Sequence, residues 1–137
     1  MKIVVIDGQG GKIGQAVIAA LKAAAPSEEI YAIGTNSAAT AAMLKAGADH
    51  GATGENPVIV AGRDADIIVG PIGIVIADSL LGELTPAMAV AVGQSRAQKF
   101  LIPLNKCATN VIGASEMPFS DYIKQTAASV LAHIAEQ

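Results

Sequence analysis

The sequence has little of several residue types, and each shortage excludes a class of protein. Among its 137 residues there is one cysteine, Cys107, so an internal disulfide is excluded. Nine basic residues against twelve acidic ones give a net charge of -3, without the basic run typical of nucleic-acid binding. Aromatic residues make up only 3 % of the composition although 52 % is hydrophobic. The core must therefore be built from Ala, Val, Ile and Leu, as in layered α/β proteins.

Long hydrophobic runs are also missing. The longest, residues 67–77, is interrupted by Gly70, Pro71 and Gly73 and is shorter than the roughly 20 residues that cross a bilayer. Ile3 begins a core-like strand at the place where a signal peptide would carry its charged and apolar regions. We therefore expect a cytoplasmic protein that binds neither nucleic acid nor a membrane.

Short apolar runs alternate with segments of helical periodicity along the chain. Strands are predicted at residues 2–6, 29–33, within 48–54, at 66–69 and 99–104, with a short edge strand at 111–112. Helices are predicted at residues 13–24, 37–46, 74–81, 86–95 and from 120 onward, with Asn36 or Ser37 and then Thr85 as N-caps. Residues 57–63 follow the helix-start pair Asn56-Pro57, although their β-branched content would suit a strand equally well.

This alternation predicts right-handed βαβ units and a mostly parallel sheet. We expect residues 1–137 to form a single Rossmann-like nucleotide-binding domain, an α/β three-layer sandwich with five or six strands. If the strand order is 3-2-1-4-5, the switch point lies between the first and fourth strands. The loops after those strands then face each other at the carboxyl end of the sheet, where such folds bind ligands.

A glycine-rich segment, Gly8-Gln9-Gly10-Gly11-Lys12-Ile13-Gly14, joins the first strand to the first helix. Glycine there permits a tight turn and close approach by a phosphate, which the positive N-terminus of the helix favours. Its spacing is G-x-x-G-x-x-G, because the third glycine of the common dinucleotide fingerprint would fall on Ile13. We interpret all seven residues as phosphate or cofactor ligands, the alternative being a turn that only lets a strand enter a helix.

Two further loops are expected at the same crevice. Thr35, Asn36 and Ser37 follow the second strand, where a ribose-binding acidic residue is usual but absent. Their side chains could bind a 2′-phosphate or a ribose, or cap the next helix, and capping is favoured. Gly70-Pro71-Ile72-Gly73 follows the fourth strand. The expected cofactor is NAD(P) or another nucleotide, and the absence of Arg near Thr35 gives NADP little support.

The sequence assigns no catalytic set. The first βα unit resembles that of extended short-chain dehydrogenases, including the ending Ile13-Gly14, but their Tyr-x-x-x-Lys pair is absent because Tyr122 lies two residues before Lys124. No metal-ligand spacing is present either. Several polar residues of the expected crevice have roles that stay open: Asp7, Glu55, Asp78, Asn105 and Cys107.

A set of motifs spread over nearly the whole chain resembles an uncharacterised family of small bacterial proteins, a domain of unknown function. These motifs are the segment from Ile6 to Gly11, then Gly34-Thr35-Asn36-Ser37, residues 43–48, residues 51–56, Gly70-Pro71-Ile72-Gly73 and Pro103-Leu104-Asn105. The resemblance implies a compact α/β protein without an assigned activity.

Three functional hypotheses follow. The first is a small nucleotide- or dinucleotide-binding protein, a ligand sensor or accessory subunit, with its phosphate at the Gly8 to Gly14 loop. The second is an enzyme acting on a small phosphorylated or carboxylated metabolite. The third is a structural partner that forms a homodimer or larger homo-oligomer through its apolar segments at residues 72–81 and 90–92.

Overall fold

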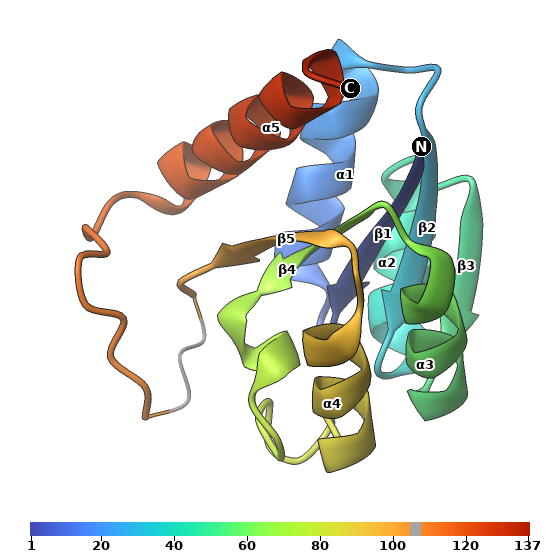
Figure 1. Cartoon of the computed structure of the whole chain (residues 1–137), viewed down its shortest axis with the longest axis vertical. Helices are drawn as coiled ribbons and strands as arrows, with labels where there is room; N and C mark the ends of the chain where they lie inside the picture. The colour runs from blue at the N-terminus through green and yellow to red at the C-terminus, as the bar shows by residue number, and fades with distance from the viewer. Residues whose placement is uncertain (105–107) are drawn as a thin grey trace.

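A parallel five-stranded sheet lies between two layers of helices in the computed structural model, which describes residues 1–104 and 108–137 (Figure 1). The strand order is β3-β2-β1-β4-β5, the order considered, but not established, from the sequence, and every pairing is parallel. The switch point therefore lies between β1 and β4. The strands are β1 (Lys2–Asp7), β2 (Glu29–Gly34), β3 (His50–Thr53), β4 (Ile67–Pro71) and β5 (Gln98–Ile102).

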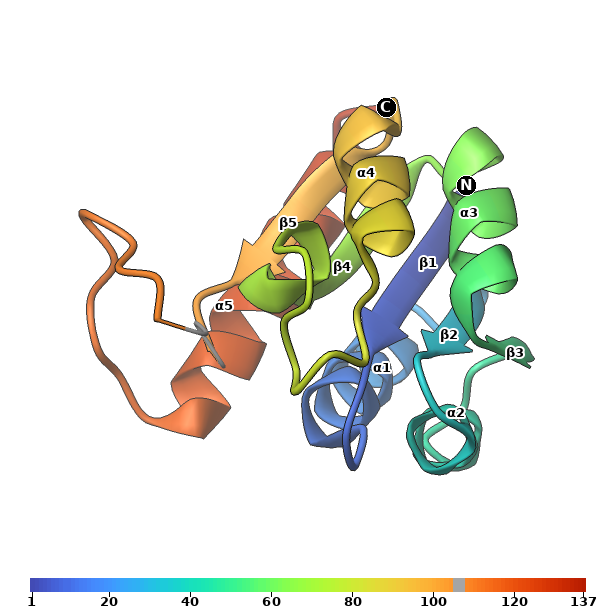
Figure 2. The same cartoon turned by 90° about the horizontal axis from the view of Figure 1, so that it is seen from below.

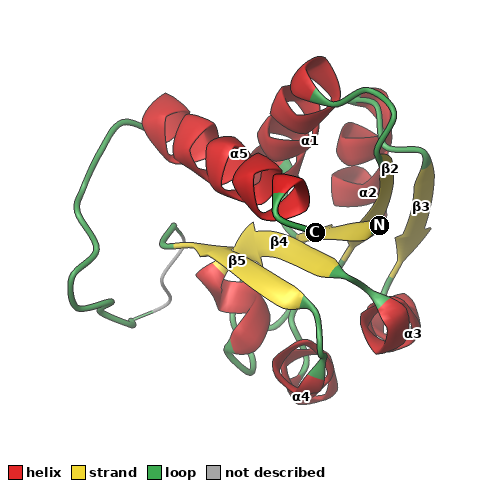
Figure 3. Ribbon diagram, turned by 45° about the horizontal axis from the view of Figure 1, so that its top comes forward, coloured by secondary structure: helices red, strands yellow, loops and turns green. Residues whose placement is uncertain are grey.

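The helices divide between the two faces of the sheet. One face is covered by α1 (Lys12–Ala24), α2 (Ser37–Lys45) and α5 (Phe119–Ala135), and the other by α3 (Glu55–Asp64) and α4 (Pro86–Gln94) (Figure 3). A 3-10 helix, η1 (Ile72–Val75), follows β4 directly. This is the Rossmann-like three-layer sandwich expected from the alternation of strands and helices. No helix in residues 1–104 or 108–137 is long and apolar enough to cross a membrane.

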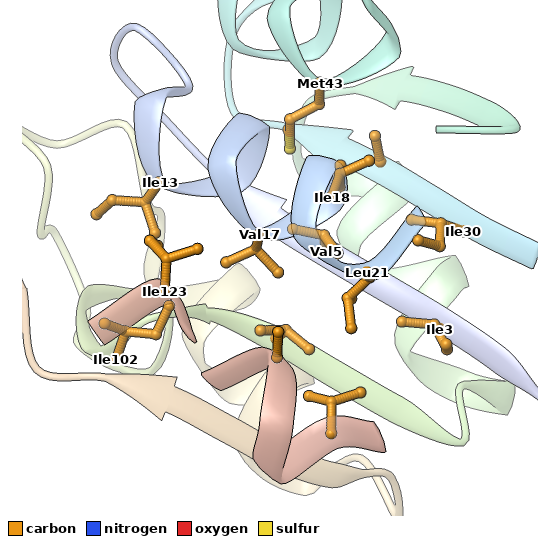
Figure 4. Close-up of a cluster of buried hydrophobic side chains, with 14 of the residues drawn as sticks. Ile3, Val5, Ile13, Val17, Ile18, Leu21, Ile30, Met43, Ile102 and Ile123 are labelled. Atoms are coloured by element: carbon orange, nitrogen blue, oxygen red, sulfur yellow. The ribbon is translucent and has the colours of Figure 1, made fainter. Parts of the chain in front are cut away.

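The core is aliphatic and lies on both sides of β1. Ile3 and Val5 face α1, α2 and α5, whereas Val4 and Ile6 face α3 and α4, and all four side chains are fully buried. Figure 4 shows the first of these clusters, in which side chains of α1 fill the space above the sheet. A sheet that is buried on both faces has continuous apolar strands, which is why the strand runs were recognisable in the sequence.

The N-termini of the helices show which sequence signals were interpreted correctly. Asn36 accepts a hydrogen bond from the N–H of Ala39 and caps α2, and Thr85 caps α4 in the same way. Residues 57–63 are helical, but α3 begins two residues before Pro57 and its N-cap is Gly54. The expectation that Asn56 caps this helix is therefore wrong. Pro57 is tolerated in the first turn because a backbone N–H there has no intrahelical partner.

Residues 74–81 do not form the predicted buried helix. The chain leaves η1 at Val75 and continues through turns in which Asp78, Leu80 and Leu81 have positive φ angles of 64°, 56° and 57°. Leu80 is buried while Leu81 is 95 % exposed. An apolar run alone does not distinguish a helix from a buried turn, and here Ile74 packs in the core while Leu80 packs against the loop at Gly8.

The predicted edge strand at residues 111–112 is also absent, and the sheet ends at β5. Residues 108–118 form a loop that extends away from the body of the molecule before α5 begins (Figure 2). The side chain of Ile112 is 94 % exposed. A β-branched pair such as Val111-Ile112 makes a strand only where another strand lies beside it.

Candidate functional site

The loop between β1 and α1 lies at the carboxyl end of the sheet. The N–H of Gly11 donates to the carbonyl of Gly8 at 2.9 Å and closes a tight turn. Gly11 then serves as the N-cap of α1 in a left-handed conformation, with φ at 74°. Since β1 pairs with both β2 and β4, this turn is next to the loops that follow those two strands.

Three of the four glycines in this loop are explained by packing within the chain. A Cβ atom on Gly8 would lie 2.5 Å from the Thr35 hydroxyl, and one on Gly11 would lie 2.9 Å from backbone atoms of Ala39. Gly14 packs as closely on Met43. Gly10 differs from all three, because a Cβ there would meet no atom within 4 Å and its φ is not left-handed.

Asp7, the last residue of β1, holds the two ends of the loop together. Its Oδ1 accepts the N–H of Gly8 at 2.8 Å and its Oδ2 accepts the N–H of Gly14 at 2.7 Å. The side chain is almost completely buried. Burial raises the pKa of the Asp7 carboxyl above its ordinary value, although hydrogen bonds from Gly14, Gly8 and Ile13 act in the opposite direction. The Asp7 carboxylate therefore already accepts hydrogen bonds from some of the N–H groups at the start of α1.

The residues after β2 lie against this loop. Asn36 uses its side-chain oxygen to cap α2, the role favoured by the sequence, and donates from its Nδ2 to the carbonyl of Gln9 at 2.9 Å. The N–H of Thr35 donates to the carbonyl of Asp7. Ser37 is the first residue of α2 and has no side-chain hydrogen bond in the described structure. The loops after β1 and β2 are thus brought together as expected.

A segment that the sequence did not single out crosses the same region. We call residues 76–84, between η1 and α4, the strap; it runs past the tip of β1 (Figure 2). The Ser79 hydroxyl donates to the carbonyl of Gly73, and the N–H of Asp78 donates to the carbonyl of Leu84 at 2.8 Å. The buried side chain of Leu80 lies against Gly8. The strap thus covers the outer side of the Gly8 turn.

Glu83 of the strap contacts both loops at once. Its Oε1 accepts hydrogen bonds from the N–H of Gln9 at 2.9 Å, the Thr35 hydroxyl at 2.8 Å and the Asn36 Nδ2 at 2.6 Å. Partial burial would raise the pKa of Glu83, but these three donors together hold it below its ordinary value. The carboxylate is therefore ionised at neutral pH.

Glu83 was missed because nothing in its sequence context marks a site. It follows Gly82 at the end of an apolar run, and a helix was expected to end nearby. Gly82 did not reveal the turn, since a glycine after such a run is equally typical of the C-terminal end of a helix. Its distance of 74 residues from Gln9 along the chain leaves no local pattern that would connect the two.

The segment after β4 lies near the Gly8 loop, but packing within the chain explains why it contains glycine. A Cβ on Gly70 would lie 2.4 Å from the carbonyl of Ile6, so glycine permits the close pairing of β1 and β4. Pro71 ends β4, and Ile72 and Gly73 begin η1. Gly73 touches the site only through its carbonyl, which accepts the hydroxyl of the strap serine.

The other polar candidates contribute unequally. Lys12 lies at the start of α1 with its Nζ 4.8 Å above the Phe119 ring, and the Glu55 carboxylate accepts the Thr85 hydroxyl at 2.6 Å, at the base of the strap. Asp78 is exposed. Asn105 and Cys107, together with Lys106, lie outside the described residues. Within residues 1–104 and 108–137, no group of three or more His, Cys, Asp or Glu side chains could hold a metal ion.

Comparisons with known proteins show which family the chain belongs to and which solved structure has a similar fold. The family model described as "Domain of unknown function (DUF3842)" matches residues 2–135. None of the curated proteins compared with the chain matches it. Among solved structures, the chain is similar to a dodecameric FMN-dependent UbiX-like decarboxylase from Escherichia coli O157:H7, with 18 % identity and a TM-score of 0.52 over 98 % of this chain and 94 % of that one. A likeness at this identity establishes the shared α/β fold.

Proposed function

The chain belongs to the DUF3842 family, a domain of unknown function, and from that premise we propose that it is a small nucleotide-binding protein. In this proposal residues 1–137 act as one binding domain, and the phosphate lies at the Gly8 to Gly14 loop. The loops at Thr35 to Ser37 and Gly70 to Gly73 border the remainder of the ligand. Its biological role would be that of a ligand sensor or an accessory subunit.

Gly10 is the observation that carries the proposal. Neither packing nor a left-handed φ requires glycine at this position, unlike at Gly8, Gly11 and Gly14. The remaining physical reason for a glycine in such a loop is close approach of a ligand to the backbone. No acceptor for the N–H of Gly10 is present in the described part of the chain.

The start of α1 supports a phosphate at the same place. Among its first N–H groups, Gly14 is bound by Asp7, whereas Lys12 has no acceptor among the residues that the structure describes. A phosphate oxygen between Gly10 and Lys12 would satisfy both donors and meet the positive end of the helix. The Lys12 ammonium, which lies over the Phe119 ring, is the basic side chain of this loop and would supply positive charge for the phosphate.

The cofactor would be NAD(P), FMN or another nucleotide. A solved structure of similar fold is an FMN-dependent UbiX-like decarboxylase, and the shared fold supports a nucleotide-type ligand at the carboxyl end of the strands. The same decarboxylase favours a second candidate function, an enzyme that acts on a small carboxylated metabolite. It is also dodecameric, which supports a homo-oligomer for this chain.

Isothermal titration with FMN, FAD, NAD, NADP, ATP and AMP tests the proposal. We expect at least one of them to bind, and Gly10→Val to weaken that binding by about tenfold or more, the equivalent of about 1.4 kcal/mol. Gly93→Val is the matched control, because Gly93 is also open to space but lies near the end of α4, outside the loop. Absence of heat and of any thermal shift with all six nucleotides would contradict the proposal, as would equal binding by both variants.

A further inference from the structure

The end of β2 lacks the acidic side chain that holds a ribose in many dinucleotide-binding folds, yet a carboxylate is present there. It belongs to Glu83, which reaches the end of β2 from the strap and contacts Thr35 and Asn36. Resting on the proposed nucleotide site, we infer that Glu83 supplies the missing acidic group and binds the 2′- and 3′-hydroxyls of a ribose. The site then selects nucleoside diphosphates whose ribose is not phosphorylated.

The two oxygens of Glu83 are in different situations. Oε1 already accepts three hydrogen bonds, from Gln9, Thr35 and Asn36, and this fixes the orientation of the carboxylate. Oε2 accepts none from the described residues. A carboxylate oxygen has two lone pairs, so Oε2 can accept one hydrogen bond from each hydroxyl of a ribose diol.

The backbone of the strap is held in an unfavourable conformation that positions this carboxylate. Asp78, Leu80 and Leu81 all have positive φ angles, followed by Gly82 at 86°. A bulky residue such as leucine rarely adopts this conformation, which persists only where the surroundings enforce it and which concentrates at functional sites. The buried Leu80 and the Ser79 hydrogen bond fix the strap within this turn, before Gly82.

Charge determines which part of a nucleotide meets Glu83. Hydroxyl groups are neutral donors that a carboxylate accepts well, whereas a phosphate beside Glu83 would be repelled by it and by Asp7. The unbound N–H groups of Gly10 and Lys12 follow Gln9 along the loop and donate no hydrogen bond to Glu83 in the described structure. The diphosphate is therefore assigned to Gly10 and Lys12, and the ribose to Glu83, so the two ends of the ligand are read by different residues.

The opposing interpretation is that Glu83 stands in for the phosphate and must be displaced when a nucleotide binds. On this interpretation neutralising Glu83 strengthens the binding of any polyanion, because the carboxylate no longer occupies the phosphate position. Inorganic pyrophosphate has no sugar hydroxyls. Its binding therefore distinguishes a Glu83 that binds ribose from a Glu83 that occupies the phosphate position.

Isothermal titration of the full chain with ADP, 2′-deoxy-ADP and inorganic pyrophosphate tests the inference. The wild-type chain is expected to bind ADP about ten- to a hundredfold more tightly than 2′-deoxy-ADP, the range for hydrogen bonds to a charged group. Glu83→Gln is expected to remove this preference and leave pyrophosphate binding within about twofold. Glu29→Gln, at the opposite end of β2, makes the same charge change as a control and should retain the preference.

The outcomes separate the two proposals. Equal wild-type affinity for ADP and 2′-deoxy-ADP, or an unchanged preference in Glu83→Gln, overturns the ribose role while the nucleotide site stands. Tighter pyrophosphate binding by Glu83→Gln overturns it in favour of the stand-in. If the wild-type chain binds neither ADP nor pyrophosphate but does bind one of the six nucleotides above, the ribose role is wrong while the nucleotide site stands. If it binds none of them, both proposals are wrong. The wild-type comparison needs no variant, so it remains decisive even if Glu83→Gln folds poorly.

Discussion

The Gly8 to Gly14 loop and the strap meet over the tip of β1, and each carries a carboxylate that accepts N–H groups of the same loop. Asp7 belongs to the loop's own strand and is buried, whereas Glu83 reaches it from 74 residues away and is partly exposed. The pKa of Asp7 is raised by burial, but that of Glu83 is lowered by its three donors. Similar hydrogen bonds thus give opposite shifts, because the extent of desolvation differs.

The backbone of the two segments differs in a related way. The loop has Gly11 at its closely packed left-handed position, and its other left-handed residue is the polar Gln9, whereas the strap places two leucines in that conformation. The loop is held by the local hydrogen bonds of Asp7 and by close packing of its glycines against the second βα unit. The strap depends on contacts with residues far away in the sequence, so changes in the two segments should affect different properties.

The largest expected effect is a difference in stability between variants of two adjacent glycines of the loop. Gly11→Ala should lower the free energy of unfolding by about 2–4 kcal/mol, because its Cβ would both strain a left-handed residue and press on the backbone of Ala39. Gly10→Ala should change it by less than about 0.5 kcal/mol, as at an open surface position. Urea denaturation of both variants measures the difference. Equal destabilisation would show that the two glycines do not differ as described.

The next effect is a pH dependence of opposite sign for the two carboxylates. A raised pKa means that the contribution of Asp7 is full below about pH 4 and is lost as the pH rises through its folded pKa. Relative to Asp7→Asn, whose side chain does not titrate, the wild-type chain should therefore lose stability as the pH rises above about 4. The pKa of Glu83 is lowered, so its contribution is present above about pH 4 and is lost on acidification.

Glu83→Gln should accordingly lose stability relative to the wild-type chain at neutral pH and approach it in acid. Unfolding free energies measured for both variants from pH 3 to pH 7 check these signs, with changes on the order of 1 kcal/mol. Solvent screening makes the Glu83 effect the smaller of the two. If the unfolding free energy changed with pH in the same way in both variants, the pKa shifts of Asp7 and Glu83 would not be opposite in direction.

The smallest effect concerns strain in the strap. Leu81→Gly should raise the free energy of unfolding by about 0.5–1 kcal/mol, because the left-handed backbone is relieved while the 95 % exposed side chain loses no packing. Leu80→Gly is the control at a similar φ, but that side chain is buried, so its removal should destabilise the protein. Thermal unfolding of the two variants distinguishes them, and destabilisation by Leu81→Gly would mean that the exposed leucine has a contact of its own.

The sequence allowed the sheet to be predicted because its signals are local. The apolar strands and the caps Asn36 and Thr85 each follow from residues within a few positions of one another. The packing roles of Gly8, Gly11 and Gly14 could not be predicted in the same way, since Thr35, Ala39 and Met43 come from the next βα unit. A glycine pattern indicates where another group approaches the backbone closely. It does not tell whether that group is a ligand or another helix.

The position of Glu83 was beyond sequence reasoning for a stronger reason. Whether residues 74–81 continue as a helix or turn back as a strap depends on which surface receives Leu80, and that surface exists only once β1, β2 and β4 have paired. The same apolar residues are compatible with both outcomes. Asn56 gives a smaller example, because the helix-start pair was correct about the helix but not about the residue that begins it.

The long sequence separation between Glu83 and Gln9 has a consequence for the order of events in folding. Gly14 and Asp7 are seven residues apart, so their hydrogen bond closes a short loop, whereas the Gln9 bond to Glu83 spans 74 residues. Contacts between distant residues carry a larger loop-closure entropy and depend on earlier pairing of the intervening strands. We therefore expect the Gly8 turn to form before the strap closes on it, and the amide proton of Gln9 to become protected only when the strap closes.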